Sequence, residues 1–228
     1  MHLKMLSGGA ANGLVNKVRD AFKSQTGREI EGDFGAVGGM RDRIAGGEQI
    51  DIAILTRAAI ETLVATGKLA ADTVTDLGRV DTGVAVKSGN AHPRIGDAVV
   101  LAELFRSADA LFCPDTVHAT AGIHFASVLE QLGVGNAVSL KEFPNGQTAM
   151  AAMAKSDLAA PIGCTQVTEI LNTDGVDYIG PLPSPYDLST VYTAAIAVNA
   201  EAPEDALTLI GLLADPENAD LRRSVGFS

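Results

Sequence analysis

Short apolar segments alternate with amphipathic segments along this chain, and no other property limits the possible folds as strongly. The first pair shows the pattern. Residues 3–6 form an apolar run and residues 7–9 a Ser-Gly-Gly turn, after which apolar side chains recur at helical spacing up to Phe22. A strand that leads through a turn into an amphipathic helix is the unit from which parallel sheets covered by helices are built.

The same unit recurs along the sequence and predicts an α/β chain with mostly parallel strands. Gly and Pro residues separate the segments, as expected for the turns between strands and helices. The later strand-like segments are residues 27–34, 49–55, 109–114, 137–143, 158–164, 176–183 and 189–200.

Two long extended segments, around residues 80–87 and 186–198, stand apart from this alternation. We interpret them as two hinge crossings between lobes. Lobe I then comprises residues 1–82 plus 193–228, and lobe II residues 83–192. Because ligands of open α/β sheets bind at the carboxyl ends of strands, we expect several turns to converge on one cleft between the lobes.

The composition excludes several classes of protein. The 228 residues carry a formal charge of −11, which makes nucleic acid a poor partner. No apolar run reaches the roughly 18 residues of a membrane span, so we expect no membrane insertion. Cys113 and Cys164 indicate neither a disulfide framework nor a metal knuckle, and we expect no metal and no cofactor.

The first strand follows Met1 almost at once, without a basic segment, apolar core and cleavage site before it. We therefore expect a cytoplasmic protein. If a leader has been removed, we expect a periplasmic protein instead, with a transporter subunit as its partner.

The turn Ser7-Gly8-Gly9 is the first candidate binding element. Glycines let a ligand approach the backbone, and the N–H groups at a helix start attract anions. The pattern is neither Gly-x-Gly-x-x-Gly nor a Walker phosphate loop. It indicates a small-anion site of no fixed kind, or a helix cap without a ligand.

Four segments of the chain form a recognisable series: MLSGGAANGLVNKVRDAFKSQTG (residues 5–27), IEGDFGAVGGMRDRIAGGEQIDIAIL (30–55), CPDTVHATAGIHFASVLEQLGV (113–134) and PNGQTAMAAMAKSDLAAPIGCTQVTEI (144–170). In this order they resemble the molybdate-binding-protein-like branch of the type II solute-binding proteins. The resemblance covers nearly the whole chain. It implies two lobes, each a mostly parallel sheet flanked by helices, with a ligand cleft between them.

The resemblance also assigns ligand-binding residues to the turns after the strands. Each has a structural alternative as a helix cap, a turn residue or a solvated surface arginine. The candidate ligand-binding residues on these turns are Ser7, Gly8, Gly9, Ala36, Val37, Thr56, Arg57, Ala119, Thr120, Asn145 and Thr165.

The sequence departs from the molybdate binders at places that bear on the ligand. Those proteins hold a tetrahedral oxyanion with hydroxyls and amides, and a tyrosine follows their late strand. Here residues 36–38 lack hydroxyls and residues 163–165 lack that tyrosine, whereas Arg57 suits a planar carboxylate. We therefore predict a di- or tricarboxylic acid as ligand, with molybdate or tungstate as a minor alternative.

The alternative function is enzymatic, because the same branch includes aconitate isomerases. Moving a double bond in a polycarboxylate requires a base near neutral pKa. The candidates are His118 and Cys113, both near the loop at residues 113–122. The competing interpretations are an exposed histidine and a cysteine that packs as a small apolar side chain.

Overall fold

The computed structural model describes residues 2–228, which divide into two compact units. Unit 1 comprises residues 2–80 and 190–228, and unit 2 comprises residues 81–189. The chain passes between them within β4 (Thr75–Lys87) and at the start of β9 (Ser189–Ile196). The limits expected from the sequence, after residues 82 and 192, lie two and three residues from these points.

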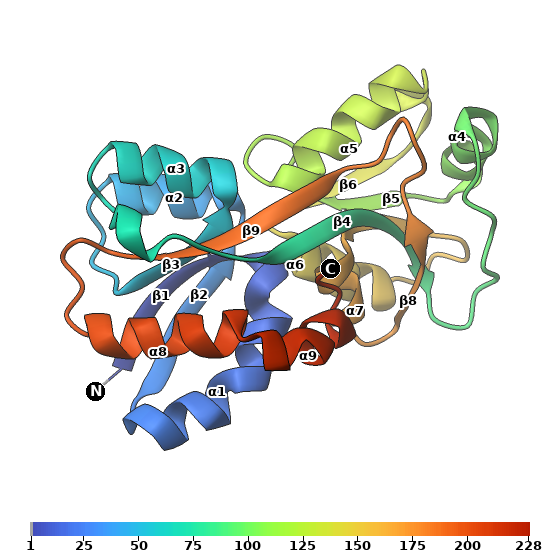
Figure 1. The fold of residues 1–228 in the computed structure, drawn as a ribbon. Helices are drawn as coiled ribbons and strands as arrows, with labels where there is room; N and C mark the ends of the chain where they lie inside the picture. The colour runs from blue at the N-terminus through green and yellow to red at the C-terminus, as the bar shows by residue number, and fades with distance from the viewer. Residues whose placement is uncertain (1) are drawn as a thin grey trace. The chain divides into compact units, whose positions relative to one another are not determined.

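Unit 1 is built on the strand order β2-β1-β3-β9, in which the first three strands are parallel and β9 is antiparallel to β3. Helices α2 and α3 cover one face of this sheet, and α1 and α8 lie on the other (Figure 1). The elements are β1 (His2–Gly8), α1 (Asn12–Thr26), β2 (Glu29–Gly35), α2 (Val37–Ala45), β3 (Ile52–Thr56), α3 (Arg57–Ala65), α8 (Pro203–Ala214) and α9 (Ala219–Ser224).

Unit 2 is built on the order β4-β7-β5-β6, with β8 also paired to β4. Strands β5, β6 and β7 are parallel, whereas β4 is antiparallel to both β7 and β8. The further elements are α4 (Ala98–Ser107), β5 (Leu111–Pro114), α5 (Thr120–Gln131), β6 (Leu140–Phe143), α6 (Gly146–Ala154), β7 (Ile162–Gln166), α7 (Val167–Leu171) and β8 (Val176–Pro181).

Alternate residues of the unit 2 strands enter two separate cores. Val84 and Cys164 pack with side chains of α4 and α5, whereas Ala85 packs with methionines of α6. Helices therefore cover both faces of this sheet, and its strands are apolar on both sides. Because side chains alternate along a strand, the neighbours Thr165 and Gln166 at the end of β7 project toward opposite faces.

The predicted α/β class is confirmed, and the helix predicted after the first turn buries its apolar stripe, from Leu14 to Phe22, as expected. The sequence also predicts helix starts at Thr120 and Thr165. The first is confirmed, since Thr120 is the first residue of α5 with Ala119 as its N-cap, and the second is wrong. Thr165 does not begin a helix, because the backbone continues as β7 through Gln166 in its ladder with β4. Within residues 2–228, no helix combines the length and the apolarity needed to span a bilayer.

Candidate functional site

The parallel strands of unit 1 end together at one edge of its sheet. In the ladders of β1, Gly8 is the partner of Gly35, and Ser7 is the partner of Ile54. The turns after these strands therefore lie along one edge. The ends of these strands and the turns after them carry all the site residues predicted within unit 1, namely Ser7, Gly8, Gly9, Ala36, Val37, Thr56 and Arg57.

This edge offers backbone groups more than side chains. The hydroxyl of the buried Ser7 donates to the carbonyl oxygen of Gly8 at 2.9 Å, so its hydrogen is used within the turn. Helices α2 and α3 begin at the N-caps Ala36 and Thr56, and neither N-cap side chain accepts a hydrogen bond from its helix. Helix starts of this kind attract anions through their N–H groups.

Arg57 does not present an unpaired cation. Its Nη1 donates to both carboxylate oxygens of Asp76 at 2.9 Å, and its Nε lies 3.4 Å from Glu61 Oε1. The hydroxyl of Thr193 donates to the same Asp76 at 2.7 Å. The contacts of Arg57 correspond to the structural alternative, a surface arginine paired with carboxylates, and we do not retain it as the charge partner of the ligand.

In unit 2 the parallel strands β6, β5 and β7 also end at one edge, where α5, α6 and α7 begin. Ala119 and Thr120 lie at the start of α5, which packs closely on the end of β5. A Cβ atom on Gly122 would lie 2.2 Å from the carbonyl oxygen of Asp115. Asn145 caps α6 by accepting from the backbone N–H of Thr148 at 2.8 Å, so its side-chain oxygen has a structural role.

The side chain of Thr165 is hydrogen-bonded to a buried carboxyl group. Its hydroxyl donates to Glu169 Oε2 at 2.6 Å, and the N–H groups of Gly146, Gln147 and Gln166 also donate to Glu169. Burial raises the pKa of Glu169, and these donors offset part of that rise. The protein thus places its own carboxyl group at the start of α6, where an external anion would otherwise be attracted.

Three buried polar side chains near this edge were not predicted from the sequence. The exposed fraction is 2% for Gln166 and 1% for Thr82 and Thr168. Gln166 and Thr82 are partners across the β7–β4 ladder and project from the same face. The side-chain Nε2 and Oε1 of Gln166 and both threonine hydroxyls have no hydrogen-bond partner within the described part of the chain. Buried polar groups of this kind require an explanation, and a bound ligand supplies one.

The candidate bases differ in their surroundings. Burial raises the pKa of Cys113 to about 12, so its thiol does not suit a base at neutral pH, and burial also raises the pKa of Cys164 well above its usual value. His118 is 52% exposed, and its Nδ1 lies 3.2 Å from Asp115 Oδ1 on the turn before α5. Of the two candidates, only His118 keeps a position compatible with proton transfer.

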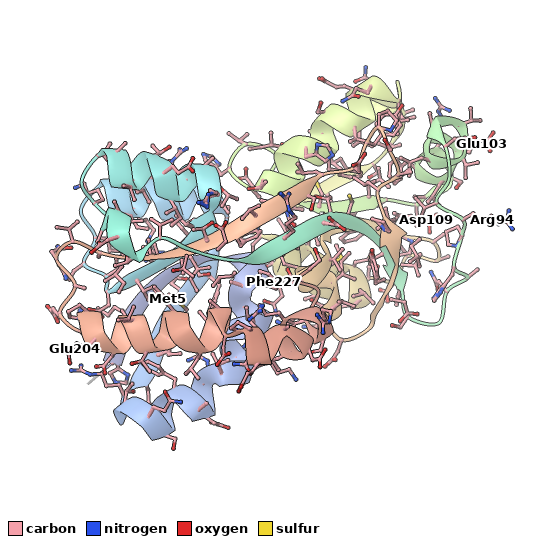
Figure 2. All side chains as sticks on the ribbon, in the orientation of Figure 1. Met5, Arg94, Glu103, Asp109, Glu204 and Phe227 are labelled. Atoms are coloured by element: carbon pink, nitrogen blue, oxygen red, sulfur yellow. The ribbon has the colours of Figure 1, made fainter. Side chains whose placement is uncertain are left out.

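A pocket of about 510 Å³ lies elsewhere in unit 2. It is lined by Ile162 and Pro161 at the start of β7, the end opposite Gln166, and its lining holds no charged side chain. The charged Arg94 and Glu103, from the neighbouring loop and α4, project outward from the ribbon (Figure 2). Within residues 2–228, no group of three or more His, Cys, Asp or Glu side chains is arranged to hold a metal ion.

The profile of the bacterial extracellular solute-binding proteins matches residues 3–228. An aconitate isomerase from a Pseudomonas species is 26% identical over 237 residues, covering 95% of this chain and 84% of that protein.

Solved structures match the fold over nearly the full chain. The periplasmic molybdate-binding protein of Azotobacter vinelandii has a TM-score of 0.79 at 17% identity, covering 99% of this chain and 98% of that one. The sulfate-binding protein SubI of Mycobacterium tuberculosis has a TM-score of 0.75 at 16% identity, covering 100% and 86%. At these identities the likeness shows the fold alone.

Proposed function

This chain belongs to the family of bacterial extracellular solute-binding proteins, and we propose that it binds a small di- or tricarboxylic acid. The single observation that carries the proposal of a ligand site is the set of buried side chains Gln166, Thr82 and Thr168 at the carboxyl edge of unit 2. Their polar atoms find no partners among residues 2–228. The relation to an aconitate isomerase, whose name refers to a tricarboxylate, supports the same class of ligand.

Neutral groups would perform the recognition. In unit 1 we assign ligand contacts to the uncapped helix starts at Ala36 and Thr56 and to the turn Ser7-Gly8-Gly9. In unit 2 we assign them to the start of α5 at Ala119 and Thr120, and to Gln166 in place of Thr165. That both edges bind one ligand stays a prediction of the sequence. A transporter subunit remains the proposed partner of an exported form.

An isomerase is the second candidate function, and the aconitate isomerase relative is the observation that favours it. In this case the same site would hold an unsaturated polycarboxylate. A base would remove a proton next to one carboxylate and return it at the other end of the allyl unit. His118, oriented by Asp115, is the base that we propose for this reaction.

A thermal-shift screen tests the proposal. The panel contains molybdate, tungstate, sulfate, phosphate, and di- and tricarboxylates that include cis- and trans-aconitate. A ligand at about a hundred times its Kd stabilises the protein by about 2.7 kcal/mol, which raises the Tm of a chain of this size by roughly 5 to 10 °C. A shift with carboxylates supports the proposal, and a shift with only the inorganic oxyanions overturns it.

The isomerase candidate needs a separate readout. Wild type and His118→Ala are incubated with cis-aconitate, and the product is followed by proton NMR. Formation of trans-aconitate by the wild type, lost in a variant that still binds cis-aconitate, supports catalysis by His118. If the wild type binds cis-aconitate but forms no trans-aconitate, the isomerase candidate is overturned and the proposed binding function remains.

A further inference from the structure

The hydrogen-bonding groups of Gln166 restrict the chemical class of the ligand more than the charge of the ligand does. Its Nε2 is a donor and its Oε1 is an acceptor, and both are unpartnered among residues 2–228. Thr82 and Thr168 add hydroxyls that can donate or accept. The carbonyl oxygen of Gln166 therefore needs a donor, and a buried acceptor that is left unpaired costs free energy.

A fully ionised ligand cannot provide that donor. Molybdate, sulfate and an ionised carboxylate carry only acceptor oxygens, which suit the Nε2 of Gln166 and the threonine hydroxyls. None of them has a hydrogen to give to Oε1. A hydroxyl group can donate to Oε1 and accept from a neighbouring donor at the same time.

Glu169 does not use the side chain of Gln166. Its carboxyl group accepts from the hydroxyl of Thr165, which projects from the opposite face of the sheet, and from backbone N–H groups that include that of Gln166. The side-chain amide of Gln166 and the hydroxyl of Thr82, on their own face, therefore stay available to a ligand.

We propose that the ligand is a hydroxy acid, whose hydroxyl group donates to Gln166 Oε1 and contacts Thr82 or Thr168. This proposal rests on the proposed function, because it names the subclass of carboxylic acid that the same site selects. It makes Gln166 a specificity-determining residue rather than a general anion donor.

The test compares acids that differ by one hydroxyl group, using isothermal titration calorimetry on the full chain. Succinate is paired with malate, and tricarballylate with citrate. The variant Gln166→Met keeps the length of the side chain and removes its polar atoms. Gln131→Met makes the same change on α5, where the Gln131 amide donates to Ser127 in an exposed position, and serves as the matched control.

For wild type and Gln131→Met we expect the hydroxy acid of a pair to bind about ten- to a hundredfold more tightly. In Gln166→Met we expect this ratio to fall below about threefold. Equal affinities within each wild-type pair overturn the hydroxyl proposal and leave the carboxylate function standing, and this comparison needs no variant. A preference that survives in Gln166→Met overturns the role of Gln166. Failure of every acid to bind overturns the proposed function itself.

Discussion

Gly146 is the position where one added methyl group perturbs the protein most informatively. A Cβ atom there would lie 1.9 Å from Thr165 Oγ1 and 2.0 Å from Glu169 Oε2. Gly146→Ala must therefore separate the Thr165–Glu169 pair, whose hydrogen bond is worth about 1.5 to 3 kcal/mol when Glu169 is ionised. Overpacking adds about 1 to 3 kcal/mol, and the higher helix propensity of alanine returns at most about 1 kcal/mol.

The net loss in the free energy of unfolding is about 1.5 to 6 kcal/mol. In a chain of this length that corresponds to a fall in Tm of roughly 3 to 24 °C, measured by differential scanning calorimetry. Gly211→Ala is the control, because Gly211 lies within α8 with no other atom within 4 Å of the added Cβ. It should leave Tm unchanged or raise it. A Gly146→Ala protein as stable as Gly211→Ala would refute the close contact between α6 and Glu169.

Three further predictions follow from charges and burial. Because burial raises the pKa of Glu169, its contribution to stability is greatest below the unfolded value, near 4.5, and is lost as pH rises through the folded pKa. Between about pH 5 and about pH 8, the free energy of unfolding measured by urea denaturation should therefore fall more for wild type than for Glu169→Gln. Equal falls for the two proteins would contradict this. Cys113 and Cys164 should resist iodoacetamide in the native protein and react once it is unfolded, as mass spectrometry can show; rapid native labelling would exclude their burial. Arg57→Ala should change the Kd of a bound carboxylate by less than about threefold, because Arg57 already pairs with Asp76; a hundredfold loss would restore its role as the charge partner.

The fold was predictable because its signals are local. The apolar spacing of α1 and the alternation of strands with helices depend on residues that are near each other in sequence. The resemblance to solute-binding proteins is confirmed, since the family profile matches residues 3–228. The α/β class follows from both observations.

The site was less predictable because its contacts are long-range. The partner of Arg57 is Asp76, 19 residues away, and no local pattern connects them. β7 extends through Gln166 because β4 pairs with it from about 80 residues away, with Gln166 opposite Thr82. Because β7 continues through Gln166, the buried side chain without a partner among the described residues is that of Gln166. The predicted site residue, Thr165, projects from the opposite face of the sheet.

Glu169 shows a different limit. A glutamate in the first turn of a helix, as Glu169 is in α7, is usually solvated or capping, and its burial depends on the start of α6 meeting the end of β7. A polar residue at the end of an apolar strand, such as Gln166, was the available signal. Gln166 became a candidate site residue only because the structure shows that it is buried and that its side chain has no partner among the described residues.

The most direct test of the central claim is a comparison of Kd by isothermal titration calorimetry for wild type, Gln166→Met and Gln131→Met. The ligand is the carboxylic acid that gives the largest thermal shift with the wild type. We predict that Gln166→Met weakens binding at least about tenfold, because it removes a buried donor and acceptor, and that Gln131→Met leaves Kd unchanged. A carboxylate that binds Gln166→Met as tightly as the wild type would contradict the assignment of the site to Gln166.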